Sequence, residues 1–193
     1  PAPVWAGPAL MHVVVVVEYK EPVDVLAKTV ETIAQQGGIA GRPMVVLATE
    51  ARDEGRFATA EALKHQCGSR ISRFLMTEHT LREGETIGKH SNENAAVREV
   101  YRQLVEEEGK DPFEVMMTIV DADSLLSTSY LAHVEAAFNK QLDGRRLVYS
   151  GPLNTYRNFA DAGLLVQMYE VLRCNTDTFH DPLKCYYPQS NYS

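Results

Sequence analysis

Short apolar runs alternate with amphipathic stretches along most of the chain. Continuous apolar runs of about four to eight residues are typical of buried strands, and apolar residues at every third or fourth position are typical of helices. The pattern predicts five strands, at about residues 12–18, 43–49, 71–77, 115–120 and 147–151. Helices are predicted between and after them, at about residues 21–36, 57–66, 92–105, 131–138 and 159–172.

Strands that alternate with helices favour an α/β fold, with a doubly wound, mostly parallel sheet covered on both faces. The length of 193 residues is that of about one domain, so we expect a single domain over residues 1–193. In such folds, ligands bind outside the carboxyl ends of the strands, where the strand order reverses. Polar residues that follow a predicted strand are therefore the first candidates for a site.

Two carboxylates end the predicted strand at residues 115–120, because Asp121 and Asp123 follow it directly. Mg²⁺ is commonly held by one or two carboxylates together with the phosphates of a substrate. An Asp-x-Asp in this place suggests a site for a metal ion and a diphosphate. The alternative is structural, since Asp is also common at strand ends and as a helix N-cap.

Composition excludes several other classes. The net charge of −7 argues against nucleic-acid binding, which needs clustered Lys and Arg. The cysteines are odd in number and lack Cys-x-x-Cys spacing, which disfavours disulfides or a zinc site and favours a reducing compartment; they are Cys67, Cys174 and Cys185. The longest apolar runs, such as Val13 to Val17, are too short to span a bilayer. The first residue is not Met and the end carries no terminator of a helix or strand, so we expect a fragment of a longer protein.

Three motifs occur together in a characteristic order and spacing. Residues 16–22 are like a strand-end Pro-x-Tyr-Asn-Glu, residues 88–94 like a Gly-Lys-x-x-Ala-x-Asn that opens a helix, and residues 120–124 like an Asp-x-Asp with a following Ser or Thr. Over about residues 12–155, the nucleotide-sugar-binding part, the chain therefore resembles family 2 glycosyltransferases. This family has the GT-A fold, a nucleotide-diphospho-sugar transferase-like architecture. Residues 47–52 are similar to the Leu-Ala-x-Glu-x-Arg segment of a eukaryotic-type subgroup.

The resemblance implies roles for the residues at the strand ends. Asp123 would ligate Mn²⁺ or Mg²⁺ bridging the two phosphates of the donor, and Asp121 would contact the ribose or support the metal. Lys89 would approach the phosphates. Tyr19 and Glu21 would line the pocket for the base and ribose, with Glu50 beside them. Asn92 or Asn94 would contact the donor sugar.

The helix expected to start near Asn92 adds an argument from physics, since a helix amino end favours anions. The alternative is that Ser91 and Asn92 only cap this helix and that Lys89 lies in solvent.

The chain departs from the family pattern at two places. Typical members carry paired Asp residues after the second strand, where this chain has Glu50 and Asp53. No Glu-Asp pair, which would supply the general base, follows Asp123. The other acidic candidates are Glu135, Glu170 and Asp181, the last beside His180. We expect the base, and the rest of the acceptor-binding part, to lie beyond Ser193.

These features together predict a metal-dependent glycosyltransferase of the hexosyltransferase type. It would bind a nucleotide-diphosphate sugar and transfer the sugar, with inversion, to a hydroxyl of a glycan or lipid acceptor. We expect a parent protein bound to a membrane only through segments outside this chain, with this soluble domain on the cytosolic face. Two alternatives remain: a nucleotide-sugar-binding module without catalysis, and a sugar nucleotidyltransferase. The second is disfavoured because residues 17–22 lack the glycine-rich loop of that class.

Overall fold

The computed structural model describes residues 9–86, 88–140, 147–149, 162–169 and 171–172. The chain forms two compact units, one of residues 1–149 and one of residues 150–192. In the second unit, residues 164–169 and 171–172 are helical, and most of their apolar side chains are exposed. Among the residues that the structure describes, no helix combines the length and the apolarity needed to cross a bilayer.

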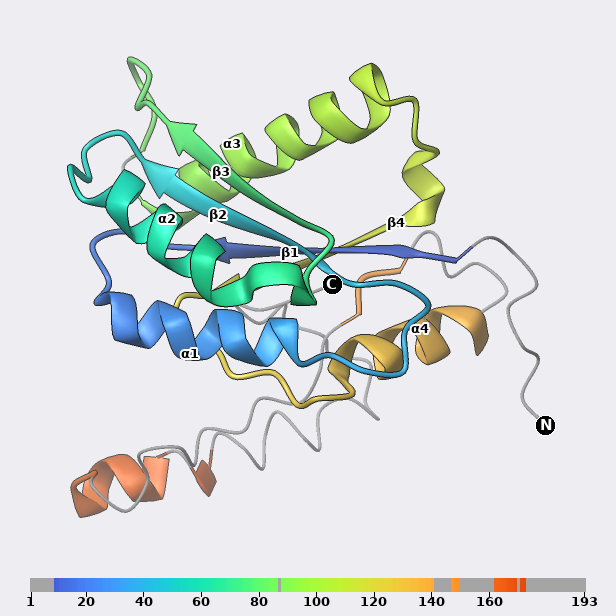
Figure 1. The fold of residues 1–193 in the computed structure, drawn as a ribbon. Helices are drawn as coiled ribbons and strands as arrows, with labels where there is room; N and C mark the ends of the chain where they lie inside the picture. The colour runs from blue at the N-terminus through green and yellow to red at the C-terminus, as the bar shows by residue number, and fades with distance from the viewer. Residues whose placement is uncertain (1–8, 87, 141–146, 150–161, 170, 173–193) are drawn as a thin grey trace. The chain divides into compact units, whose positions relative to one another are not determined.

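The first unit contains a sheet of four parallel strands in the order β3-β2-β1-β4 (Figure 1). The strands are β1 (Met11–Val17), β2 (Met44–Glu50), β3 (Arg73–His79) and β4 (Val115–Asp121). From β1 the chain moves outward through β2 to β3, and then returns to the other side of β1 to form β4. The predicted α/β, doubly wound parallel architecture is confirmed. Its strand order reverses between β1 and β4, which is where such sheets bind ligands.

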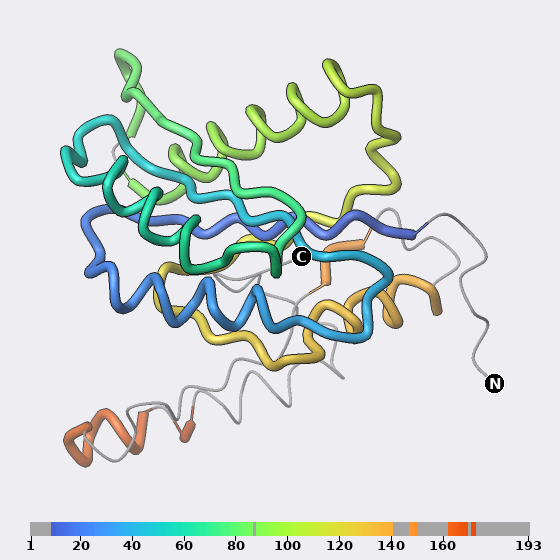
Figure 2. Tube along the Cα trace, viewed as in Figure 1, coloured from blue at the N-terminus to red at the C-terminus, as the bar shows by residue number. Residues whose placement is uncertain are grey.

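Helices cover both faces of the sheet (Figures 1 and 2). One face is covered by α1 (Val23–Ala34), α2 (Arg56–Cys67) and α4 (Tyr130–Lys140). The other face is covered by α3 (Lys89–Tyr101), which continues as a π-helical segment, η2 (Arg102–Glu107). Two short 3₁₀ turns, η1 (Gly68–Arg70) and η3 (Pro112–Glu114), precede β3 and β4.

The central strand β1 explains the run of five valines. Side chains alternate between the faces of a strand. Val14 and Val16 belong to one core cluster with Leu26 and Val30 of α1. Val13 and Val15 point to the opposite face, on which α3 packs, and neither side chain is exposed. A parallel strand buried on both faces requires apolar residues at consecutive positions, and the sequence supplies them.

The strand predicted at 71–77 lies two residues later, as β3 (Arg73–His79), and two other predictions differ more from the structure. Helix α3 begins at Lys89 rather than near Asn92. The polar residues 89–92 form its first turn because the Ser91 hydroxyl donates to the Gly88 carbonyl at 2.7 Å and Asn92 is anchored on the sheet. The strand predicted at 147–151 is absent at residues 147–149, and residues 150 and 151 lie outside the described part. Tyr149 instead packs edge-on against Phe138 of α4, with the ring centroids 6.5 Å apart.

The first testable prediction concerns the core between α1 and the sheet. Leu26 is fully buried, whereas Val23 on the same helix is 43% exposed. Replacing Leu26 by Ala leaves a cavity, so Leu26→Ala is expected to lower the free energy of unfolding by about 2–5 kcal/mol. Val23→Ala, the control, is expected to change it by less than about 0.5 kcal/mol. Urea denaturation followed by circular dichroism measures both, and equal effects would contradict the packing of α1 described above.

Candidate functional site

A cavity of about 490 Å³ lies at the carboxyl ends of β1, β2 and β4, beside the start of α3. We call it the strand-end cavity. Its walls combine carboxylates, two basic side chains, an amide and an aromatic ring, a mixture suited to a polar ligand with a flat group. It is lined by Val17, Glu18, Tyr19, Glu21, Glu50, Arg52, Gly88, Lys89, Asn92, Asp121, Ala122 and Asp123.

Parallel pairing brings these distant residues together. Val17, the last residue of β1, is the register partner of Asp121 at the end of β4. The strand β2 lies on the other side of β1 and ends at Glu50. Seven of the eight predicted site residues line the cavity: Tyr19, Glu21, Glu50, Lys89, Asn92, Asp121 and Asp123. The eighth, Asn94, is exposed on α3 and is not among the lining residues. The binding roles of all eight stay predictions.

Helix α1 holds the segment that carries the two aspartates. The Thr29 hydroxyl donates to the Ala122 carbonyl at 2.7 Å, and the Thr32 hydroxyl accepts from the Leu126 amide at 3.2 Å. Figures 1 and 2 show the chain after β4 running beside α1. Asp123 is exposed and the Asp121 side chain is 31% exposed, so neither carboxylate is turned into the dry core.

The side chains that could coordinate a cation fit a metal site that is completed by the phosphates of a ligand. Within the described residues, no group of three or more His, Cys, Asp or Glu side chains could hold a metal ion. The strand-end cavity does contain the carboxylates of Asp121 and Asp123. Two carboxylates on one cavity suit Mg²⁺ or Mn²⁺ when the phosphates of a ligand supply the other oxygen ligands. These residues therefore fit a cation bound together with a diphosphate, rather than a cation in an all-protein cage.

The turn after β1 is folded by its own acidic side chains. Lys20 has φ 62°, in the left-handed region that non-glycine residues rarely adopt. Its amide donates to the Glu18 carboxylate at 3.0 Å, and the Tyr19 amide donates to the Glu21 carboxylate. Such strained residues persist where the surrounding structure holds them, often at ligand sites. The turn presents the Tyr19 ring on the wall of the strand-end cavity.

Arg52 stacks on that ring and is a site residue that the sequence analysis missed. Its guanidinium lies 4.8 Å from the centroid of the Tyr19 ring. It also donates to the Glu50 carboxylate, with Nε at 3.0 Å, and this hydrogen bonding raises the pKa of Arg52. Arg52 was within the segment similar to Leu-Ala-x-Glu-x-Arg, which could have identified it. The Tyr19–Arg52 pair offers an aromatic and cationic surface of the kind that binds planar rings.

Glu18 is the second residue that was missed. It is only 2% exposed, and its Oε1 has no hydrogen-bond partner among the described residues. Burial raises the pKa of Glu18 to about 7, with the nearby carboxylates of Asp53, Glu21 and Glu50 acting in the same direction. An acidic residue directly after five valines was the signal in the sequence.

Asn92 anchors α3 over the strand ends. Its side-chain amide donates to the carbonyl of Ala48 at 2.9 Å and to the carbonyl of Glu18 at 3.3 Å. These two bonds join the first turn of α3 to the ends of β2 and β1. Asn92 therefore has a structural role that is independent of any ligand.

Lys89 brings a positive charge from α3 to the aspartates. Its ammonium forms an ion pair with Asp121 and lies 3.5 Å from the Glu93 carboxylate. The alternative in which Lys89 projects into solvent is not what the structure has, since only 30% of this side chain is exposed.

The one acidic candidate for a general base within the described residues is not brought to the strand-end cavity. Glu135 of α4 lies 3.1 Å from the ring of His12, near the start of β1. Val17 lies five positions after His12, a distance of roughly 17 Å along a strand. The side chains of Glu170, His180 and Asp181 lie outside the described part of the chain. Within the described residues, the base predicted for an inverting transferase is therefore not identified.

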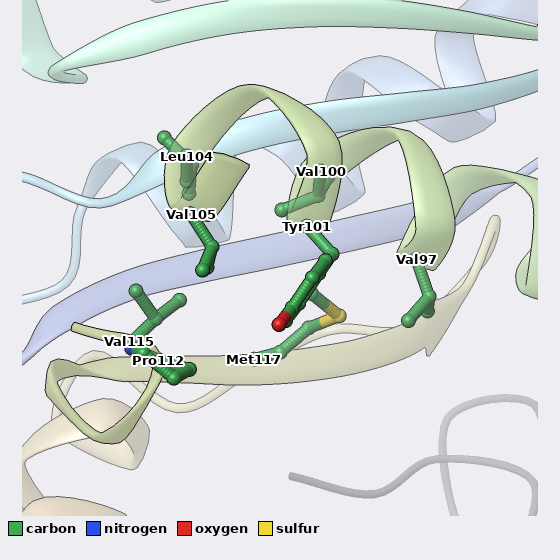
Figure 3. Close-up of a pocket in the computed structure, with 8 residues that line it drawn as sticks. All are labelled: Val97, Val100, Tyr101, Leu104, Val105, Pro112, Val115 and Met117. Atoms are coloured by element: carbon green, nitrogen blue, oxygen red, sulfur yellow. The ribbon is translucent and has the colours of Figure 1, made fainter. Parts of the chain in front are cut away.

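A second, smaller cavity of about 110 Å³ lies between α3, η2 and β4 (Figure 3). Its lining is almost entirely apolar, and Figure 3 shows the ring of Tyr101 and the side chain of Met117 within the space between helix and strand. Ligand sites combine an apolar surface with a few polar groups that orient the ligand. This cavity offers little beyond the Tyr101 hydroxyl, so the strand-end cavity is the better candidate.

No protein-family model and no curated protein matches the chain. The resemblance to family 2 glycosyltransferases therefore stays a prediction that rests on the three motifs.

The buried carboxyl of Glu18 generates the second prediction. Its pKa in the folded protein is about 7, above the ordinary value of 4.5. The neutral carboxyl therefore contributes stability at low pH, and this stability is lost as the pH rises through about 7. Glu18→Gln keeps a neutral side chain at every pH and still accepts from the Lys20 amide. We expect this variant to be more stable than the wild type by on the order of 2 kcal/mol at pH 8, and by little at pH 4.5.

Urea denaturation at the two pH values measures this difference. Glu61→Gln, at an exposed position on α2, is the control and should behave like the wild type at both. A stability gain for Glu18→Gln that does not change with pH would show that the carboxyl is not neutral in the fold.

Proposed function

We propose that this chain is the donor-binding domain of a metal-dependent glycosyltransferase. It binds a nucleotide-diphosphate sugar in the strand-end cavity, for transfer of the sugar, with inversion, to a hydroxyl of a glycan or lipid acceptor. The observation that supports this proposal most is that one cavity, at the reversal point of a parallel sheet, collects the residues of all three motifs.

In this proposal, different residues of the cavity bind different parts of the donor. Tyr19 and Arg52 take the flat base, because their stacked side chains form an aromatic and cationic surface. Glu21 and Glu50 lie next to them and accept from base or ribose donors. The first turn of α3 faces the diphosphate, since backbone N–H groups at a helix amino end favour anions. Of the two asparagines predicted to contact the donor sugar, only Asn92 lines the cavity, so it is the one assigned to the sugar.

Asp121 and Asp123 hold Mn²⁺ or Mg²⁺ at the diphosphate. When bound, this cation offsets the charge that develops on the leaving nucleoside diphosphate. The acidic walls favour a diphosphate that brings a cation. Even without Glu18, whose pKa is about 7, the carboxylates of the cavity outnumber its basic side chains, so a bare diphosphate would be repelled.

The alternative is a nucleotide-sugar-binding module without catalysis. One observation favours it: Glu135, the only described acidic candidate for the base, contacts His12 instead of the strand-end cavity. An inverting transfer needs a base within hydrogen-bond reach of the acceptor hydroxyl. Release of nucleoside diphosphate from a donor, with water or a hydroxyl as acceptor, would contradict the binding-module alternative.

The third prediction tests donor binding directly. Isothermal titration calorimetry with UDP, GDP, ADP and CDP in turn should find one that binds in the presence of Mn²⁺ and weakly or not at all with EDTA. Asp123→Ala is expected to weaken that binding by about 100-fold or more, because a lost metal ligand leaves the diphosphate charge uncompensated. Asp24→Ala removes a carboxylate whose side chain is 75% exposed on α1, and should bind as the wild type does.

Equal binding by Asp123→Ala and the wild type would contradict the metal site. The absence of binding for all four nucleotides, with a wild-type chain shown to be folded by its denaturation curve, would contradict the proposed function itself.

A further inference from the structure

The ion pair between Lys89 and Asp121 joins two elements that are far apart in the sequence. Lys89 is the first residue of α3, and Asp121 is the last residue of β4. Both side chains line the strand-end cavity and both are about one third exposed. The pair is therefore accessible to a ligand and is not a contact of the core.

Lys89 is held from two sides. Besides Asp121, it lies 3.5 Å from the Glu93 carboxylate, one helical turn along α3. Glu93 is 5% exposed and also lies 3.1 Å from the His90 ring. A lysine side chain has a flexible stem of four carbons. Glu93 can thus keep the ammonium at the cavity wall when the contact with Asp121 is broken.

Asp121 is one of the two carboxylates assigned to the divalent cation. An ammonium that pairs with this carboxylate and a divalent cation that binds it repel each other strongly at such short distances. The two cations therefore compete for Asp121. The diphosphate, by contrast, attracts both, and its oxygens form strong charge-assisted hydrogen bonds with an ammonium.

We propose that Lys89 occupies the place of the divalent cation at Asp121 in the free protein, and moves to the diphosphate when the cation binds. This inference rests on the proposed function, since it needs both a cation and a diphosphate in the strand-end cavity. It assigns Lys89 opposite effects on the two ligands: it weakens the binding of the cation alone and strengthens the binding of the nucleotide.

The experiment measures the two affinities separately in the wild type and in Lys89→Gln. Mn²⁺ alone is titrated and followed by electron paramagnetic resonance of the unbound ion. The nucleoside diphosphate that binds the wild type most tightly is then titrated at saturating Mn²⁺ by calorimetry. Lys89→Gln is expected to bind Mn²⁺ alone about three- to tenfold more tightly, because a competing cation is removed. It should bind the nucleotide about tenfold or more weakly, because a charge-assisted bond to phosphate is lost.

Two further variants separate the replacement of Lys89 by the cation at Asp121 from the general effect of removing one positive charge near the cavity. Lys20→Gln removes the same charge from a side chain that lies over the Tyr19 ring, at 5.2 Å from its centroid, instead of at Asp121. It should change the affinity for Mn²⁺ by less than about twofold. Lys89→Arg keeps a cation that can pair with both a carboxylate and a phosphate. Its affinities for Mn²⁺ and for the nucleotide should therefore stay closer to those of the wild type than the affinities of Lys89→Gln.

The inference would be overturned if Lys89→Gln bound Mn²⁺ no more tightly than the wild type does. It would also be overturned if the affinities for Mn²⁺ and for the nucleotide changed in the same direction. If the wild type binds both ligands, such a result leaves the proposed function intact. If the wild type binds neither, the proposed function and this inference fail together.

Discussion

The parallel pairing of β1 with β4 is the constraint on which the rest of the site depends. Because Val17 lies opposite Asp121, the turn that carries Tyr19 and Glu21 and the segment that carries Asp123 leave the sheet at the same edge. A shift of one residue in the register of β1 or β4 would turn the side chains of that strand to the opposite face of the sheet. Helices on both faces then complete the walls, with α3 anchored through Asn92 and α1 through Thr29. The strand-end cavity is thus a consequence of strand order and register.

Charge is the second organising feature. Carboxylates outnumber basic side chains in the cavity. Burial, together with the carboxylates of Asp53, Glu21 and Glu50, raises the pKa of Glu18 to about 7. A cavity of this kind disfavours a bare diphosphate and favours a diphosphate that brings a divalent cation. The basic groups are distributed accordingly: Arg52 is bound to Glu50 beside the aromatic ring, and Lys89 lies at the aspartates. The flat and the charged parts of a nucleotide would therefore bind at different ends of the same cavity.

The sequence predicted the four strands of the sheet well because buried parallel strands read as continuous apolar runs, as the valines of β1 and residues 115–120 show. The strand ends were predicted for the same reason, and with them the residues that converge at the cavity. The helix start at Lys89 was misplaced because it depends in part on the bond from Asn92 to Ala48 of β2, a tertiary contact that no local pattern encodes. Glu18 and Arg52 were missed because their importance lies in burial and stacking, and these arise only when β1 and β2 lie side by side. The strand predicted from Leu147 and Val148 is not present at these residues, since an apolar run of that length can pack outside a sheet as well as extend one.

The location of the cation is the point at which the account can be tested most directly. Bound Mn²⁺ broadens the nuclear magnetic resonance signals of nearby amides, so spectra recorded with Mn²⁺ and a nucleoside diphosphate report where the ion lies. We expect the strongest broadening at Tyr19, Lys89 and Asp123, and clearly weaker broadening at His12 and Phe138, which lie away from the strand-end cavity. Selective broadening around His12 and Phe138, or no selective broadening anywhere, would contradict the account.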